Sequence, residues 1–300
     1  MQNDWQGRLK EIETGNTKSL ARAISLIENE VEGYEEFLQS LPQSSLSVIG
    51  ITGPPGAGKS TLTDALIAAM VEDGKRVGVL CVDPSSPFNL GALLGDRIRM
   101  SEWYNNPNVY IRSLATRGSL GGLHPKIIEI TDVMKVAAFD YIIVETVGVG
   151  QSEIEIAGLA DMTMVVLVPE AGDEVQNMKA GLMEIGQLFI VNKADRPDAD
   201  RFLKNLKLTL SPSDKHQAVE ILKTIASTKT GITDVYEAIK KYFNQPRQNE
   251  KRYYLLAEKV YYLLQQRRMK DINKKDLYYK LKQQAVNNIY AFIAKAFPHS

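Results

Sequence analysis

A glycine-rich stretch, GPPGAGKST, lies between an apolar run at 46–51 and an amphipathic run that begins near residue 61. In a strand–loop–helix setting, backbone N–H groups of such a loop can converge on one anion, because glycine has no Cβ to block the approach. The N-terminus of the following helix adds partial positive charge. The pattern Gly-x4-Gly-Lys-Ser therefore predicts a loop that binds phosphate. Its residues are Gly53, Pro54, Pro55, Gly56, Ala57, Gly58, Lys59, Ser60 and Thr61.

A second motif, IVNKAD, indicates which base accompanies the phosphate. It ends the apolar run at 187–193 and provides Asn192, Lys193 and Asp195. A carboxylate can accept hydrogen bonds from the N1–H and the exocyclic amine of guanine, whereas adenine presents the wrong pattern on that edge. The stem of Lys193 can cover the face of the base. In combination with the phosphate loop, this motif favours GTP over ATP, so we expect GTP and GDP as ligands.

Three side chains are candidates for the chemistry at the γ-phosphate. We expect the Lys59 ammonium to reach the β- and γ-phosphates and the Ser60 hydroxyl to ligate Mg²⁺. Glu145 ends the apolar run in IIVETVGVGQ and is followed by Gly148, an arrangement typical of groups that sense Mg²⁺ and the γ-phosphate. Val149 stands where Ras-like enzymes carry the glutamine that orients water. Because valine cannot orient water, we predict slow GTP hydrolysis that depends on another group or on a partner.

Two further carboxylates follow apolar runs. Asp83 stands in CVDPSSPF and Asp96 in GALLGDRIRM. Ligands bind beyond the carboxyl ends of the strands in sheets of this kind, which favours a role in the site. Aspartate before proline also starts turns, so capping of a loop is the alternative for these positions.

Composition limits the class of protein. The chain has 300 residues, and its 36 Lys and Arg balance its 36 Asp and Glu, which gives no support to nucleic acid as a partner. No apolar run approaches the roughly 18 residues that span a bilayer, so we expect no membrane partner. The one cysteine, Cys81, lies in an apolar run and is expected to be a buried thiol. The first residues lack the apolar core of a signal peptide, and we expect a cytoplasmic protein.

The hydrophobic pattern predicts an α/β fold. Residues 1–44 show helical periodicity, and from 45 to 245 strand-like runs alternate with amphipathic helices, which indicates a P-loop NTPase G domain with a mainly parallel central sheet. The expected strands are 46–51, 76–82, 108–114, 141–147, 162–168, 187–193 and 219–227. Residues 246–300 predict a helical arm with helices at about 249–268 and 273–297. Sequence alone leaves open whether this arm covers the α/β core or forms a dimer.

Seven segments together resemble the MeaB/ArgK family, the GTPases associated with methylmalonyl-CoA mutase. In chain order they are GPPGAGKST, VDPSSPF, LLGDRIRM, IRSLATRGSLGGL, ETVGVGQSE, PEAGDEVQ and NKAD. The resemblance covers about 45–245 and implies a G domain of the SIMIBI class and a homodimer held partly by the C-terminal arm. It also implies a GTP-dependent chaperone of an adenosylcobalamin-dependent acyl-CoA mutase, which gates cofactor loading and protects the mutase.

The same resemblance assigns roles to individual residues. It implies that Asp83, Asp96 and Glu145 surround the metal and the attacking water. It places Ser227, in the loop ASTKTG, beside the guanine base. It also implies that the segment 170–180 is an additional switch that relays the nucleotide state to the partner.

Two other functions are compatible with a phosphate loop. A nickel-insertion GTPase would need soft or imidazole ligands, but the chain has one cysteine and three histidines, with none at chelating spacing. We expect His124, which precedes Pro125, to have a local capping or surface role. A kinase acting on a periplasmic amino-acid-binding protein would need a second substrate pocket, for which the sequence gives no signal. Detection of phosphate transfer to protein rather than to water would distinguish the kinase.

Overall fold

The computed structural model describes eight stretches of the chain: 4–83, 100–116, 123–146, 152–171, 185–210, 219–245, 249–284 and 288–297. For residues 83, 152–155, 171, 249–252, 254, 255 and 274, only the backbone is described. The chain divides into two compact units, Met1–Arg247 and Gln248–Ser300.

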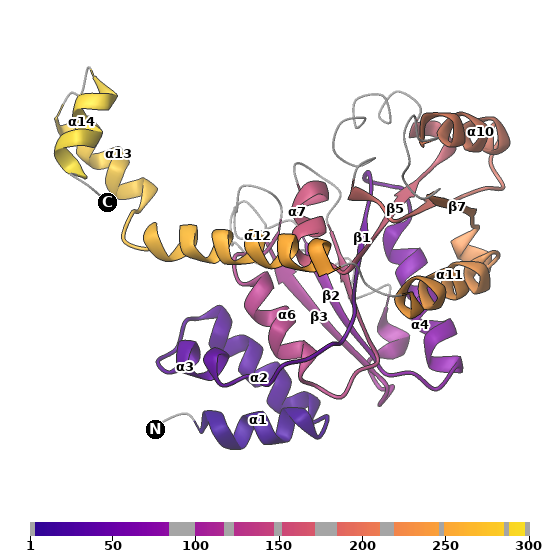
Figure 1. Ribbon diagram of the computed structural model, residues 1–300, viewed down its shortest axis with the longest axis horizontal. Helices are drawn as coiled ribbons and strands as arrows, with labels where there is room; N and C mark the ends of the chain where they lie inside the picture. The colour runs from indigo at the N-terminus through magenta and orange to yellow at the C-terminus, as the bar shows by residue number, and fades with distance from the viewer. Residues whose placement is uncertain are drawn as a thin grey trace. The chain divides into compact units, whose positions relative to one another are not determined.

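The first unit is built on a parallel sheet of seven strands (Figure 1). The strands are β1 (Val48–Thr52), β2 (Val77–Asp83), β3 (Val109–Ala115), β4 (Tyr141–Glu145), β5 (Met162–Leu167), β6 (Leu188–Val191) and β7 (Glu220–Lys223). Their order across the sheet is β3-β2-β4-β1-β5-β6-β7, and each neighbouring pair is parallel. Each of the seven expected strands is present, with ends that differ by a few residues, and the predicted α/β class is confirmed.

Helices cover both faces of this sheet. The helices that follow the N-terminal segment are α4 (Lys59–Glu72), α6 (Ile127–Lys135), α7 (Ser152–Leu159), α10 (Ala199–Leu210) and α11 (Ile232–Asn244), and the 3₁₀ turns are η1 (Ser101–Trp103), η2 (Pro169–Ala171) and η3 (Ala226–Thr228). Helices α4 and α11 share one apolar cluster with one face of the sheet, while α10 packs on the opposite face. Figure 1 shows α6 across the sheet from α4 and α11.

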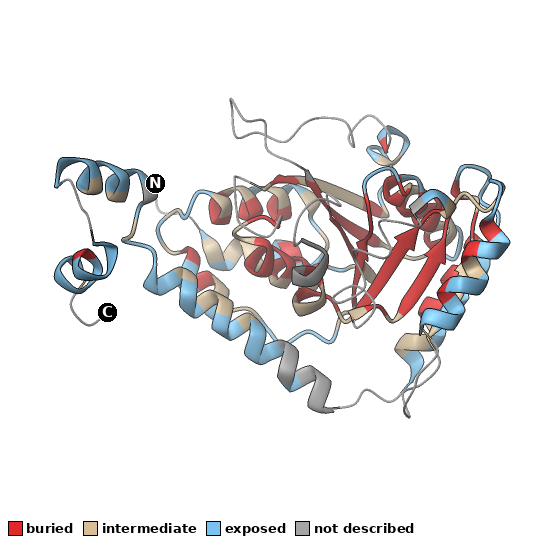
Figure 2. Ribbon diagram, turned by 90° about the horizontal axis from the view of Figure 1, so that it is seen from above, coloured by how far each residue is buried: buried red, intermediate tan, exposed pale blue. Residues whose placement is uncertain are grey.

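Burial on both faces explains why the strands are apolar at nearly every position. All five residues of β1 and all six of β5 are buried, and Figure 2 shows the strands as a buried layer between helices with exposed outer sides. Cys81 on β2 is the buried thiol that its apolar surroundings predict.

Parallel strands bring their carboxyl ends to one edge of the sheet. In the register of the ladder, Glu145 lies opposite Ile51 and Cys81, and Asp83 lies opposite Ala115. The segments that follow β1, β4, β6 and β7 therefore start at the same edge. This topology places the expected phosphate loop and the expected guanine motif close together in space, although Lys59 and Asn192 lie 133 positions apart in the sequence.

The N-terminal helices belong to the same compact unit as the sheet. Three helices occupy the segment predicted to be helical: α1 (Trp5–Glu13), α2 (Thr17–Glu28) and α3 (Tyr34–Gln39). Asn16 caps α2 by accepting hydrogen bonds from the amides of Lys18 and Ser19.

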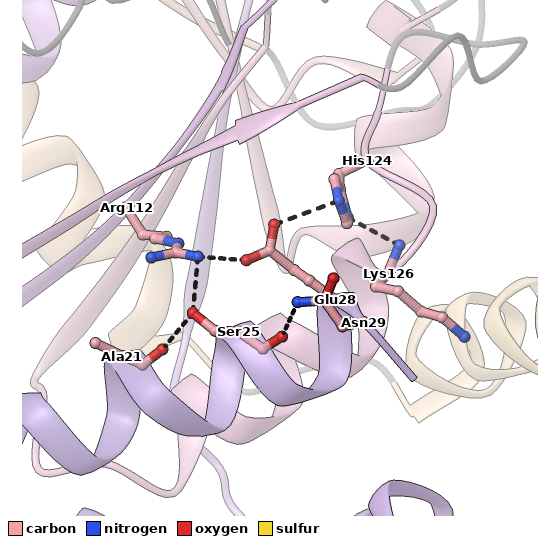
Figure 3. A network of polar contacts seen from close by, with 7 residues as sticks. All are labelled: Ala21, Ser25, Glu28, Asn29, Arg112, His124 and Lys126. Atoms are coloured by element: carbon pink, nitrogen blue, oxygen red, sulfur yellow. Dashed lines mark hydrogen bonds and ion pairs between the residues drawn. The ribbon is translucent and has the colours of Figure 1, made fainter. Parts of the chain in front are cut away.

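A half-buried carboxylate, that of Glu28, attaches α2 to the edge strand and to the start of α6 (Figure 3). Glu28 forms an ion pair with Arg112 of β3, and its Oε1 lies 3.7 Å from His124 Nε2. Arg112 also donates to Ser25 Oγ at 3.2 Å. A single side chain of α2 thus contacts both the strand before and the helix start after residues 117–122.

His124 caps the chain locally, as predicted, but it is not a surface residue. Its Nδ1 accepts the amide of Lys126 at 3.0 Å, and the ring is only 1% exposed. Of the two predicted alternatives, the surface role is wrong, because Glu28 of α2 lies against this position, a contact that a local pattern does not reveal. Next to it, burial tends to lower the pKa of Lys126, but the hydrogen bond that Lys126 donates to Glu30 and the negative charge of Glu129 outweigh this and raise the pKa.

The second unit is helical. Its helices are α12 (Asn249–Arg268), α13 (Lys274–Gln283) and α14 (Ile289–Ala296). The single helix predicted over 273–297 was wrong, because Asn288 ends that pattern: its side chain caps α14 by accepting the amides of Tyr290 and Ala291. Across the described parts of both units, we find no helix with the length and apolar character needed to cross a membrane.

The contacts of Glu28 predict a measurable loss of stability on neutralisation. Glu28→Gln keeps the shape of the side chain but removes the charge that faces Arg112 and His124. Because hydrogen bonds to charged groups are worth about 1.5–3 kcal/mol, we expect the free energy of unfolding to fall by about 2 kcal/mol. Urea unfolding followed by tryptophan fluorescence measures it, since both tryptophans, Trp5 and Trp103, belong to this unit.

Glu36→Gln on α3 is the matched control, because Glu36 is exposed. We expect a change within about 0.5 kcal/mol there. Equal effects of the two substitutions would contradict a structural role for the Glu28 network.

Candidate functional site

The phosphate loop lies between β1 and α4 with its lysine turned inward. Lys59 is only 6% exposed, and its ammonium donates to the carbonyls of Gly53 at 2.9 Å and Pro54 at 3.1 Å. The loop therefore surrounds a buried cation at the start of α4, where the helix dipole adds positive charge. This is the electrostatic environment that a phosphate group requires.

Two glycines of the loop are required by close contacts. A Cβ at Gly53, which has φ 143°, would lie 2.1 Å from the Val166 carbonyl oxygen of β5. A Cβ at Gly58, which has φ 87°, would lie 2.4 Å from Asn192 Nδ2. The first glycine lets the loop pass over β5, and the second lets the guanine motif reach the loop.

Glu145 is held by two hydroxyls of α4. Ser60 donates to Glu145 Oε1 at 2.6 Å, and Thr63 Oγ1 lies 2.8 Å from Oε2. The carboxylate is 3% exposed. The structure thus brings together Lys59, Ser60 and Glu145, three residues predicted for the γ-phosphate side, and adds Thr63, which the sequence reasoning missed. The spacing of Thr63 three residues after Ser60, on the same face of a helix, is the signal that could have identified it.

Asn192 links the phosphate loop to two other segments. Its Nδ2 donates to the Ala57 carbonyl at 2.9 Å, and its Oδ1 accepts from the Thr224 hydroxyl at 3.0 Å and the Ala226 amide at 3.1 Å. Three of its four polar positions are thereby paired in a side chain that is 2% exposed. Sequence reasoning assigned Asn192 to the base but did not predict these contacts.

Lys193 extends from the guanine motif to the phosphate loop. It has a left-handed φ of 55°, and its ammonium donates to the Gly56 carbonyl at 2.7 Å. Its side chain therefore joins the guanine motif to the phosphate loop. Asp195 and Ser227 are both exposed at this edge of the sheet, where a carboxylate and a hydroxyl are accessible to a ligand.

An ion pair joins this edge to the segment predicted as a further switch. Glu170 of η2 pairs with Arg196, the residue after Asp195. The hydrogen bond from Arg196 holds the pKa of Glu170 below its usual value. The remainder of that segment, 172–180, lies outside the described residues.

The other predicted site residues are described only in part. The backbone of Asp83 ends β2 at the same edge, opposite Ala115, while Asp96 and Gly148 lie outside the described residues. Within the described stretches, no group of three or more His, Cys, Asp and Glu residues could hold a metal ion. The roles of the individual site residues stay predictions.

A parallel α/β sheet, a phosphate loop after β1 and an N-K-x-D motif after β6 define the class of this protein as a P-loop GTPase. The chain belongs to the family described as "Methylmalonyl Co-A mutase-associated GTPase MeaB", which it matches over residues 20–280. Its family predicts binding of guanine nucleotide and hydrolysis of GTP in general terms, and the recognition made from the seven sequence segments is confirmed.

Relatives with curated names support this placement. A protein of Pyrococcus abyssi that is named as a GTPase is 44% identical to this chain over 241 residues. The alignment covers 78% of this chain and 74% of that protein. The "Methylmalonic aciduria type A homolog, mitochondrial" of Mus musculus is 34% identical over 254 residues, or 77% and 61% of the two chains.

A solved structure has the same fold over nearly the whole length. "Crystal structure of LAO/AO transport system kinase" superposes with a TM-score of 0.68 and covers 97% of both chains at 22% identity. At that identity the likeness shows the fold alone.

The contact between Gly58 and Asn192 predicts how the loop responds to an added methyl group. Gly58→Ala and Gly56→Ala both place alanine at positive φ, which costs about 1–2 kcal/mol. Gly56 has φ 75°, and nothing lies within 4 Å of a Cβ added there. A Cβ added at Gly58 would instead displace Asn192. We expect the free energy of unfolding to fall further in Gly58→Ala, by about 2 kcal/mol more, because buried hydrogen bonds are lost. Urea unfolding of the nucleotide-free variants measures the difference, and equal losses would contradict the predicted clash.

Proposed function

We propose that this chain is a GTP-dependent chaperone of an adenosylcobalamin-dependent acyl-CoA mutase of the methylmalonyl-CoA mutase type. In this proposal it gates the loading of the cofactor and protects the mutase from inactivation. The observation that carries the proposal is the family match over 20–280, since the family description names association with that mutase. The relative from Mus musculus, whose name refers to methylmalonic aciduria, supports the same client.

The residues of the site have distinct roles in this proposal. The Lys59 ammonium exchanges the carbonyls of Gly53 and Pro54 for phosphate oxygens, which carry full negative charge and are stronger acceptors. Asp195 accepts hydrogen bonds from guanine, and Lys193 covers the base. Asn192 acts behind these groups by keeping the two loops at a fixed distance.

Mg²⁺ suits the donors on the phosphate side. Ser60 Oγ and Glu145 Oε1 are buried oxygen atoms 2.6 Å apart, and Mg²⁺ prefers oxygen ligands. In the proposal, Ser60, Glu145, Asp83 and Asp96 hold the ion directly or through water. When bound, Mg²⁺ neutralises charge on the β- and γ-phosphates. Hydrolysis is slow without a partner, because Val149 provides no group to orient water.

The second unit supports a homodimer through the C-terminal arm. Tyr253, Leu256, Val260 and Leu264 form one stripe along α12, and each is at least 44% exposed. Residues 248–300 contain 11 Lys and Arg and 4 Asp and Glu, so this unit carries +7, and the first unit of the neutral chain carries −7. An apolar stripe on a basic arm suits a second copy of a chain whose other unit is acidic.

Capture from native lysate with and without a non-hydrolysable GTP analogue tests the proposed client. We expect a cobalamin-dependent mutase to be recovered in a nucleotide-dependent manner. Repeated recovery of a nickel enzyme would favour the nickel-insertion alternative, and phosphate transfer from GTP to a captured protein would favour a kinase. Either result would overturn the chaperone proposal.

Asp195→Asn tests whether Asp195 recognises the guanine base. The amide can donate to the 2-keto oxygen of xanthine, so we expect GTP affinity to fall about tenfold or more while affinity for xanthosine triphosphate rises. Calorimetry measures both, and capture of the client should then follow the xanthosine analogue. An unchanged nucleotide preference would refute the assignment of Asp195.

Light scattering after size exclusion tests the homodimer. We expect twice the chain mass of 33.4 kDa for the wild type and a shift toward the monomer for Val260→Glu, because the substitution buries a charge in the apolar stripe. Gln265→Glu adds the same charge off the stripe and should stay dimeric. A monomeric wild type would contradict the proposal.

A further inference from the structure

Thr63 is a buried residue of α4 that contacts the candidate site from behind. Its side chain is fully buried, and its Oγ1 lies 2.8 Å from Glu145 Oε2 and 3.0 Å from the Lys59 carbonyl oxygen. It stands one helical turn after Ser60, so both hydroxyls point to the end of β4. Neither the sequence motif nor the family description assigns a role to this residue.

The hydroxyl of Thr63 has one proton and two acceptors within reach. A helical carbonyl such as that of Lys59 already faces the amide four residues further along, so it does not depend on the hydroxyl. A carboxylate is the stronger acceptor, since hydrogen bonds to an ionised group are about twice as strong as those between neutral groups. With Glu145 ionised, the proton of Thr63 is therefore directed to Oε2.

Two contacts determine the plane of a carboxylate where one does not. Ser60 alone binds Oε1 and leaves the group free to turn about its Cγ–Cδ bond. The second contact, from Thr63 to Oε2, removes that freedom. Both hydroxyls come from one helix, so the orientation of Glu145 is coupled to the helix that starts at the phosphate loop.

We propose that Thr63 is a positioning residue that orients Glu145 toward Ser60 and the predicted Mg²⁺. The inference rests on the proposed nucleotide site and deepens it. Residues that orient a metal ligand from behind typically change metal affinity or activity by about 10–100-fold when they are removed. Thr63 acts through Glu145 and needs no contact with the nucleotide.

A purely structural role is the alternative, and the chain offers a matched control for it. Thr131 of α6 is also fully buried, and its hydroxyl donates to the Ile127 carbonyl four residues earlier at 2.6 Å. Thr131→Val therefore reports the effect of replacing a buried helical threonine that lies outside the site. Thr63→Val makes the same chemical change beside Glu145, and Thr63→Ser restores the hydroxyl.

The test uses three measurements. The first is the melting temperature of each variant. The second is calorimetry of the binding of GDP and of a GTP analogue, each with Mg²⁺ and with EDTA, and the third is steady-state GTP hydrolysis. For Thr63→Val we expect a melting temperature near that of Thr131→Val and GDP affinity in EDTA within about twofold of the wild type. The gain in affinity for the GTP analogue on adding Mg²⁺ should fall about tenfold, and kcat should fall more than KM changes. Thr63→Ser should return both quantities to within about twofold of the wild type.

The inference is overturned if Thr63→Val keeps the wild-type gain from Mg²⁺, or if Thr63→Ser fails to restore it. If Thr63→Val does not fold, Thr63→Ala and Thr131→Ala provide the same comparison without a branched side chain. Guanine-nucleotide binding by the wild type distinguishes failure of this inference from failure of the proposed function. Absence of guanine-nucleotide binding by the wild type would overturn both, whereas normal binding with an unaffected Thr63→Val would overturn the positioning role alone.

Discussion

The hydrogen bonds of Asn192 hold three segments in one arrangement at the carboxyl edge of the parallel sheet. One buried amide contacts the carbonyl of Ala57 in the phosphate loop, the hydroxyl of Thr224 and the backbone amide of Ala226. A buried polar atom left without a partner costs about 1–3 kcal/mol. Movement of the segments that contain Ala57, Thr224 and Ala226 away from Asn192 would therefore be unfavourable. The glycine at 58 follows from this constraint, because a side chain there would occupy the place of the amide.

A second constraint comes from the charges at the start of α4. The Lys59 ammonium donates to the loop's own carbonyls, and the Glu145 carboxylate accepts from two hydroxyls. Burial makes such pairing necessary, because an unpaired charge in this environment is strongly unfavourable. In the proposed function, nucleotide binding exchanges these internal hydrogen bonds for bonds to phosphate. In the proposed positioning role, the contacts of Thr63 and Ser60 keep Glu145 in one orientation during that exchange.

The sequence predicted those parts of the fold and site that depend on local pattern. Strands buried on both faces gave apolar runs, and all seven were identified. Their ends differ by a few residues because burial continues past the last paired residue, as at Val168 after β5. The phosphate loop and the N-K-x-D motif were recognised because their chemistry requires fixed residue types at fixed spacing. The errors had two causes. A distant segment, α2, buries His124, and the side chain of Asn288 caps a separate helix where the pattern predicted a continuous one.

By itself, the sequence determined the class of fold, the phosphate loop, the preference for guanine and membership of the MeaB family, since each is a property of neighbouring residues. Only the tertiary structure decided that Asn192 reaches Ala57, that Thr63 shares Glu145 with Ser60, and that Glu28 joins α2 to β3. These contacts join residues far apart along the chain. They exist because parallel strands bring their carboxyl ends to one edge and because burial requires each polar group there to find a partner.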